Sequence, residues 1–549
     1  MTEPTFPDLR VFLAELERRG DLVEVEAEVD PRLEVAEIHR RVIAAEGPAL
    51  LFRNVRGASF PLVTNLFGTA TRAELAFGRR PRRLIERLVE LAESLMPPTP
   101  RKLWGARDVA RELLRVGTKR VGRAPVLEES GHEVRLDTLP ALTTWPEDGG
   151  PFITLPQIWT EHPEGKGSNL GVYRLQIYDR SSTGMHWQIG KGGGFHYAVA
   201  EERGEALPVV ATLGGPPALL LAAVAPLPEN VPEVMLASLI AGRKLATCRL
   251  GDSPPIMAAA EMALVGRVEP GVRRPEGPFG DHYGYYSLVH DYPVFSVDAW
   301  CHRRDAIYPA TVVGKPRQED FYIGDLLQEL LSPLFPLVMP GVVDLWSYGE
   351  TGYHSLAAAV VRERYEREAM ASAFRILGEG QLSLTKFLLV LDRPIDLSDF
   401  PAVLEHLLER TQPETDLFVF SNLSMDTLDY TGPRVNEGSK GVWLGLGDPV
   451  RRLPREFRAE VLPAGVSEVH VFCGGCLVVG GPPKGEDPGA AERLASAPAF
   501  ADWPLVVLTD EPARAARSPI NFLWTTFTRF EPAADVHSAR QRVTRNQIA

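Results

Sequence analysis

The longest stretch without a charged residue runs from Ala206 to Pro228, and it is the feature that most constrains the possible fold of this chain. Its length would suit a membrane-spanning helix. Gly214-Gly215-Pro216-Pro217 interrupts it near the middle, however, and a continuous helix does not pass through adjacent prolines. We therefore predict two buried strands, Ala206–Leu213 and Ala218–Ala225, joined by a turn. No membrane partner is expected.

Length and charge narrow the functional classes further. A chain of 549 residues exceeds a single core and favours two to four domains. A net charge of −13 makes nucleic acid an unsuitable partner. Four cysteines do not form a disulfide framework, and Met1–Thr5 lacks the basic and apolar regions of a signal peptide. We expect a soluble, cytoplasmic protein.

The first part of the chain mixes helices and short strands. A helix is expected after Asp8, which can cap it, because Leu9, Phe12, Leu13 and Leu16 fall on one face. The other elements predicted here are strands at Leu22–Val29, Ala49–Phe52 and Leu62–Asn65, a helix over Pro81–Leu95 and a linker at Pro97–Pro100. A domain boundary is expected between this linker and Pro125.

The pattern changes twice after Pro125. Up to Thr311, Gly and Pro punctuate short apolar runs as in a barrel or sandwich, and strands are predicted at Gly171–Tyr178, Met185–Ile189 and Val294–Ala299. Later strands are expected at Phe387–Leu391, Val469–Phe472 and Leu505–Leu508, and helices at Tyr322–Leu331, Ala357–Leu377 and Phe400–Arg410. This alternation predicts an α/β domain. Beyond about Phe522 the apolar pattern fades, and we interpret the tail as a clasp on a neighbouring subunit.

Two segments combine unusual polar residues with a strand or a glycine loop. Ser168–Arg174 carries Asn169 and Arg174 five positions apart, on opposite faces of a regular strand. A surface amide and an ion-paired arginine would equally explain them. Gly184–His196 contains three successive glycines beside Lys191, which suits close approach to an anion but also a flexible hairpin loop.

A third segment, Pro275–Tyr286, places Glu276 and Asp281 on either side of a Gly-Pro-Phe-Gly turn. If both acids face one cavity, burial and like charge raise one pKa and keep a proton donor available. Two solvated turn acids are the alternative. Glu233 opens an apolar helix, Lys440 lies between glycines, and the lone Cys473/Cys476 pair lacks the partners of a zinc site.

In this order, the segments resemble the UbiD family of prenylated-FMN-dependent decarboxylases. The anchors are Asn169 with Arg174, Pro226 to Glu233, and Glu276 to Asp281, within a likeness that extends from Pro48–Phe52 to Phe522–Arg529. The resemblance implies a multidomain α/β (α+β) fold. Its parts would be an N-terminal α/β region (1–120), a central split β-barrel that binds the flavin (121–318) and a C-terminal α/β dimerisation domain (319–549).

The resemblance also implies a cofactor site. The positions that match its flavin-binding residues are Val172, Tyr173, Arg174, His186, Trp187, Gln188, Lys191, Gly192 and Lys440. Asn169 and Glu233 match two oxygen ligands of a divalent metal, Mn²⁺ or Mg²⁺, which holds the flavin phosphate together with a monovalent cation, K⁺ or Na⁺.

Catalytic roles follow from the same resemblance. Prenylated FMN would act as the electron sink, Arg174 would bind a carboxylate, and Asp281 would protonate the product carbon with Glu276 as its partner. The expected reaction is reversible decarboxylation of an aromatic or α,β-unsaturated acid to release CO₂. Expected partners are a prenyl-flavin synthase and further copies in a homodimer or hexamer.

The sequence departs from the family at Gly190, where most relatives carry a histidine as the third metal ligand. An inactive flavin-binding protein is therefore one alternative to the decarboxylase. A subunit of a larger carboxylase complex is another. A hydrolase with paired carboxylates is the third, but it leaves Asn169, Arg174 and Glu233 without roles.

The missing imidazole generates a first prediction. Gly190→His should tighten metal and cofactor binding, since a lost ligand weakens a metal site. Metal content per chain and cofactor retained after gel filtration should both rise. Unchanged values for both would mean that another group already completes the site.

Overall fold

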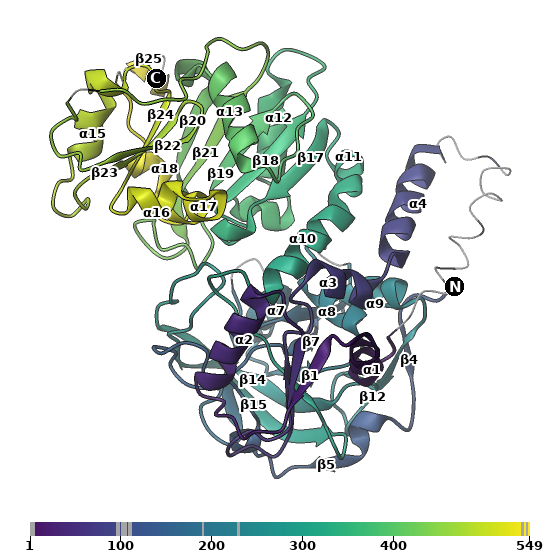
Figure 1. Ribbon diagram of the computed structural model, residues 1–549. Coiled ribbons are helices and arrows are strands. Elements are labelled where there is room, and N and C mark those ends of the chain that lie inside the picture. Colours follow the sequence, from purple (N-terminus) through teal and green to yellow (C-terminus); the bar gives the residue numbers. More distant parts are fainter. Residues whose placement is uncertain are drawn as a thin grey trace. The chain divides into compact units, whose positions relative to one another are not determined.

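The computed structural model describes residues 6–94, 99, 107, 112, 114–188, 192–227, 231–459 and 461–539, with the backbone of 543–544 and 547–548. Contacts divide the chain into two units, Met1–Leu330 and Leu331–Ala549. Figure 1 labels the elements of both. The mixed α/β architecture is the predicted one. The expected domain boundaries at 120 and 318 and the split barrel stay predictions.

The first unit contains eight labelled helices among the described residues, the last ending at the unit boundary. They are α1 (Leu9–Arg19), α2 (Glu34–Ala44), α3 (Ala70–Phe77), α4 (Arg80–Ser94), α7 (Gly192–Glu202), α8 (Pro217–Val224), α9 (Glu233–Ala241) and α10 (Glu319–Leu331). As predicted, the Asp8 side chain caps α1 by accepting from the Val11 N–H, and the apolar face of α1 is buried.

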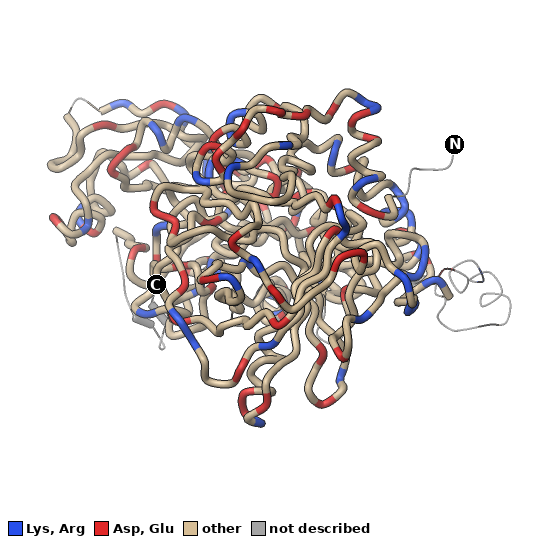
Figure 2. Tube along the Cα trace, turned by 90° about the horizontal axis from the view of Figure 1, so that it is seen from below, with Lys and Arg blue, Asp and Glu red and all other residues tan. Residues whose placement is uncertain are grey.

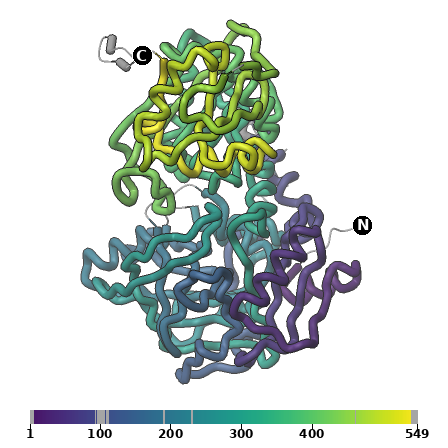
Figure 3. Tube along the Cα trace, turned by 60° about the vertical axis from the view of Figure 1, so that its left-hand side comes forward, coloured from purple at the N-terminus to yellow at the C-terminus, as the bar shows by residue number. Residues whose placement is uncertain are grey.

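The N-terminal segment joins a four-stranded sheet of order β1-β2-β3-β16. Its strands are β1 (Leu22–Val25), β2 (Ala49–Phe52), β3 (Leu62–Thr64) and β16 (Tyr308–Pro309). Strand β3 lies near the start of the first unit and its partner β16 near the end. This pairing places the N-terminal segment alongside the central strands, as Figure 3 shows in purple and teal.

The central sheet positions the polar residues singled out above. Its strands form the open path β10-β15-β14-β11-β7-β8, all antiparallel, with β5 also paired to β15. They are β5 (Glu129–Gly131), β7 (Gln157–Glu161), β8 (Ser168–Val172), β10 (Ser182–Gly184), β11 (Leu207–Leu213), β14 (Met262–Glu276) and β15 (His290–His302). Two small sheets comprise β4 (Thr118–Arg120), β12 (Leu245–Cys248) and β13 (Ile256–Met257), and β6 (Phe152–Ile153) with β9 (Leu175–Gln176).

Three local predictions in the first unit are corrected. Ala218–Ala225 is helix α8, not a strand, since Pro216 and Pro217 suit the start of a helix and the following Ala and Leu favour its continuation. The strand expected over Gly171–Tyr178 is broken between β8 and β9. Met185–Gln188 is irregular, because the His186 N–H bonds to the Arg174 carbonyl instead of extending β10.

The second unit has a five-stranded sheet of order β17-β18-β19-β21-β20. The strands are β17 (Val342–Ser347), β18 (Leu356–Val361), β19 (Phe387–Leu391), β20 (Leu417–Ser424) and β21 (Glu437–Gly445). Alternate strand residues pack against α12 (Glu368–Ile376) on one face and α13 (Phe400–Arg410) on the other. The prediction of one helix over Ala357–Leu377 is wrong for its first part, which forms β18. Both faces of this strand are covered, and burial outweighs the helix propensity of its alanines.

The remaining elements of the second unit include a three-stranded sheet of order β22-β23-β24. They are β22 (Val469–Cys473), β23 (Cys476–Gly480), β24 (Leu505–Thr509), α11 (Phe335–Val338), α14 (Pro413–Asp416), α15 (Ala490–Ala495), α16 (Pro512–Ala516), α17 (Pro519–Phe527), α18 (Pro532–Asp535), β25 (Val543–Thr544) and β26 (Gln547–Ile548). The tail does have an apolar pattern, because Phe522, Leu523 and Phe527 lie in the core of this unit.

Charged residues of both signs are interspersed through the chain (Figure 2). Many form ion pairs, such as the buried Glu261 carboxylate with Arg10 and Arg303. Among the helices that the structure describes, none has the length and apolar composition needed to cross a membrane.

The packing of Trp145 generates a second prediction. Its indole ring lies against Gly280 and Gly314 of the first unit. A Cβ on Gly280 would lie 2.0 Å from Trp145 Cδ1, and the indole N–H is held by the Val313 carbonyl at 3.0 Å. Gly280→Ala should therefore cost about 1–3 kcal/mol of unfolding free energy. Urea denaturation provides the measurement. Gly122→Ala, with nothing within 4 Å of its Cβ, is the control and should be near neutral.

Candidate active site

The break between β8 and β9 delivers Arg174 into the interior. Strand β8 ends at Val172, and the Tyr173 ring folds back over Gly171, where a Cβ would stand 2.5 Å from that ring. Both Tyr173 and Arg174 are buried. Glycine at 171 is thus required for a close approach of the chain to itself.

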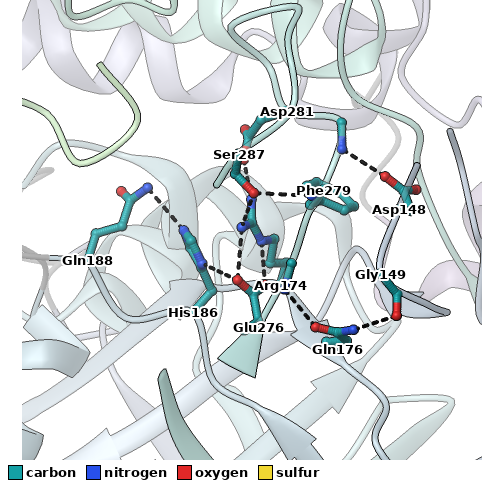
Figure 4. Close-up of polar contacts among 12 residues, drawn as sticks. Asp148, Gly149, Arg174, Gln176, His186, Gln188, Glu276, Phe279, Asp281 and Ser287 are labelled. Carbon is teal, nitrogen blue, oxygen red and sulfur yellow. Dashed lines mark hydrogen bonds and ion pairs between the residues drawn. The ribbon is translucent and has the colours of Figure 1, made fainter. Parts of the chain in front are cut away.

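Arg174 contacts both acids of the Gly-Pro-Phe-Gly segment (Figure 4). Its Nε and Nη2 donate to the two oxygens of Glu276 at 2.8 and 3.0 Å, and its Nη1 pairs with Asp281. The guanidinium also lies 4.5 Å from the centre of the Phe279 ring. A bidentate pair and a second carboxylate therefore enclose one cation.

Three residues that sequence reasoning missed hold this loop by its main chain (Figure 4). Gln176 accepts from the Gly277 N–H at 2.8 Å, Asp148 accepts from the Gly280 N–H at 2.8 Å, and Ser287 accepts from the Phe279 N–H at 3.1 Å. Ser287 also accepts from Arg174 at 3.1 Å. None has a chemical signature in the sequence, because each acts through backbone groups.

The expectation that one acid has a raised pKa is not what this geometry gives. Burial opposes ionisation of Glu276, but the charges of Arg174 and His186 and their hydrogen bonds together outweigh it and lower the pKa to about 2. Burial likewise opposes ionisation of Asp281, whose pKa is lowered by Arg174 and His282. Because the cation lies between them, both acids are carboxylates at neutral pH. This disfavours a paired-acid hydrolase, which needs one protonated acid.

His186 and Gln188 extend the polar network. His186 Nδ1 lies 3.2 Å from Glu276 Oε2, and Gln188 Nε2 lies 3.3 Å from His186 Nε2. Burial, with Arg174 nearby, lowers the pKa of His186 and favours the neutral ring. Trp187 packs near Tyr173, with ring centres 6.5 Å apart, and its buried indole nitrogen has no hydrogen-bond partner among the described residues.

Asn169 and Glu233, the two predicted metal ligands, lie side by side. Asn169 Nδ2 donates to Glu233 Oε1 at 2.8 Å, and the Leu170 N–H donates to Glu233 Oε2 at 2.8 Å. Burial raises the pKa of Glu233. Within the described ranges, however, no cluster of three or more His, Cys, Asp or Glu side chains suits a metal ion. The metal stays a prediction.

The start of α7 meets this corner. A Cβ on Gly192 would lie 2.5 Å from Asn169 Nδ2, so only glycine fits there. A helix N-terminus, two oxygen donors and the unpartnered Trp187 indole N–H form a donor set that suits the phosphate end and the ring of a flavin. These residues therefore fit the predicted cofactor.

The roles of three other residues stay predictions. Gly190 and Lys191 lie outside the described residues. Lys440 is on β21 in the second unit, where its Nζ donates to the carbonyls of Ser383 and Thr385, both at 2.8 Å. Burial lowers the pKa of Lys440 to about 8.

Comparison with known proteins identifies the class. Residues 13–92, 118–316 and 321–445 match the N-terminal, Rift-related and C-terminal domains of 3-octaprenyl-4-hydroxybenzoate carboxy-lyase, UbiD. The chain is 50% identical to a protein of Chlamydia pneumoniae named as part of a 4-hydroxybenzoate decarboxylase, over 96% of this chain and 90% of that protein.

Solved structures of two proteins share the fold. Vanillic acid decarboxylase of Sedimentibacter hydroxybenzoicus, in closed form, has a TM-score of 0.71 at 24% identity, over 84% of this chain and 97% of that one. The UbiD-class enzyme HmfF of Pelotomaculum thermopropionicum has 25% identity over 83% of this chain and 97% of its own. Its TM-scores are 0.65 for the complex with FMN and 0.64 for an evolved dimeric form with prFMN. This chain belongs to the UbiD family of carboxy-lyases.

The Arg174 cluster generates a third prediction. Arg174→Met leaves two buried carboxylates without their cation and should cost about 3–5 kcal/mol of unfolding free energy at neutral pH. In the native protein the lowered pKa of Glu276 contributes stability above its ordinary value of 4.5, and this is lost as pH falls toward about 2. The deficit of the variant should therefore shrink over that interval.

Denaturation at a series of pH values measures the effect. Arg135→Met, which removes an exposed pair with Asp137, is the matched control and should change stability by at most about 1 kcal/mol. A deficit for Arg174→Met that is small, or that grows on acidification, would contradict the arrangement.

Proposed function

We propose that this chain is a reversible, prenylated-FMN-dependent decarboxylase of an aromatic or α,β-unsaturated carboxylic acid. The observation that carries the proposal is a buried arginine held by two carboxylates, near the unpartnered indole N–H of Trp187. The prFMN complex of HmfF and the name of the Chlamydia pneumoniae relative support the cofactor and the aromatic substrate.

Residues of the first unit would hold the cofactor. Two stretches would contact the flavin: Val172, Tyr173 and Arg174, and His186, Trp187 and Gln188. Gly192 and the Asn169–Glu233 pair would face its phosphate, with a divalent metal and a monovalent cation, and Lys191 would add positive charge. The bound prenylated flavin would supply the electron sink for the electron pair left when CO₂ departs.

Arg174 organises the acid–base work. An incoming substrate carboxylate competes with Asp281 for the guanidinium, because Glu276 already occupies two of its N–H groups. The ion pair between Asp281 and Arg174 is then weakened, and the substrate carboxylate adds a negative charge nearby. Both effects raise the pKa of Asp281, so it can take up a proton. It would deliver that proton to the carbon that has lost CO₂. Glu276 holds Arg174 in place throughout.

The aromatic loop after Asp281 fits a flat substrate. Tyr283 is fully buried, with its ring centre 5.5 Å from that of Tyr285. We further propose a homodimer or hexamer and a prenyl-flavin synthase as cofactor supplier. The decisive experiment is turnover of a panel of aromatic acids by cofactor-loaded protein. CO₂ release and exchange with labelled bicarbonate would report both directions, and no turnover of any acid would reject the proposal.

A fourth prediction concerns the proton donor. Asp281→Asn keeps the size of the side chain but removes its transferable proton, so turnover should fall by about 10²–10⁴-fold while cofactor stays bound. Deuterium incorporation from heavy water at the vacated carbon should fall equally. Asp298→Asn, at an exposed carboxylate paired with Arg267, should leave both unchanged. Normal turnover and labelling in Asp281→Asn would place the donor elsewhere, with Glu276 next.

A further inference from the structure

A second acid near the catalytic loop has no role in the scheme above. Asp320 lies in the first turn of α10, and its Oδ1 is shut off from solvent with no hydrogen-bond partner among the described residues. A buried carboxyl oxygen without a partner is costly, and the cost is smaller when the group holds a proton. Such an oxygen needs an explanation.

The surroundings of Asp320 include the active site. Trp145 brings two loops together, since Cβ atoms on Gly280 and Gly314 would lie 2.0 and 2.9 Å from opposite parts of its indole. The chain continues from Gly314 into α10, whose first turn carries Asp320. The charged groups that act on Asp320 are His282 and Asp281 from that loop and its own neighbour Glu319.

These groups give Asp320 a different protonation from Asp281. Burial raises the pKa of Asp320 to about 7, His282 opposes this, and Asp281 and Glu319 add to it. Asp281 itself is ionised by Arg174. His282 interacts with both Asp281 and Asp320. Its Nδ1 is 2.5 Å from Asp281 Oδ1, its charge acts on Asp320, and its side chain is 28% exposed.

We propose that Asp320 stores the proton that decarboxylation consumes and supplies it to Asp281 through His282. The inference rests on the proposed function. Asp320 gives its proton to the His282 ring, the ring releases one from Nδ1 to Asp281, and Asp281 gives it to the carbon whose bond to CO₂ has broken. One proton enters the product for each CO₂ released, and solvent then restores the proton of Asp320 through the partly exposed His282 ring, which returns to its Nδ1–H form. Asp320 is thus a positioning residue that acts through Asp281.

The resting site needs such a store. While Arg174 holds Asp281 ionised, no proton can wait on the donor itself. Substrate binding raises the proton affinity of Asp281 only when the substrate carboxylate reaches Arg174, and a protonated neighbour can then respond without waiting for bulk solvent. The store is filled before turnover and emptied during it.

Kinetics of the cofactor-loaded protein test this role. Asp320→Asn should lower kcat on the order of 10²-fold with little change in KM. In the native enzyme kcat should decline as pH rises through about 7, and this decline should disappear in the variant. Asp320→Glu should restore part of the rate, and Asp298→Asn serves as the control. Equal kcat and an equal pH profile in Asp320→Asn would overturn the proposal.

Infrared spectroscopy of the cofactor-free protein gives a readout that does not depend on activity. A carboxylic acid C=O band should be present below pH 7, vanish as pH rises through about 7, and be missing in Asp320→Asn. Glu319→Gln controls for the neighbouring acid, whose pKa burial also raises. A spectrum unaltered by Asp320→Asn would overturn the proposal. An inactive native enzyme would instead reject the proposed function.

Discussion

The buried guanidinium of Arg174 is the interaction on which the rest of the site depends. An unpaired charge in the interior is expensive, so the fold must bring carboxylates within hydrogen-bond reach. This requirement accounts for the break after Val172, for Glu276 at the end of β14, and for a loop that returns Asp281 to the same cation. The strand break brings Arg174 into the interior, and the loop supplies the carboxylates that pair with it.

This arrangement also explains why the site cannot be a simple pair of acids. Two carboxylates facing each other would share a proton, whereas here a cation separates them and both are ionised. Proton delivery then becomes conditional on a competitor for Arg174. A substrate that carries its own carboxylate supplies that competitor, so the arrangement links recognition of the acid group to the readiness of the donor.

Locally encoded elements were predictable from the sequence. Helix α1, with its Asp8 cap, and the buried strand β19 follow from patterns within a few residues, and the order of the polar motifs indicated the family. Prediction failed where context decides: α8 is apolar throughout, and β18 is an alanine-rich strand because both its faces are covered. Protonation of the acids depends on Arg174 lying between residues about a hundred positions away, which no local spacing reveals.

The anchors of the catalytic loop have a consequence for how such an enzyme can diversify. Gln176, Asp148 and Ser287 bind main-chain N–H groups, and Asp281 and Tyr285 are joined by a further backbone bond of 3.1 Å. Main-chain contacts are indifferent to the side chains they support. The partly exposed Tyr285 can therefore be exchanged while these main-chain bonds keep the shape of the loop, and substrate range can evolve separately from acid–base chemistry.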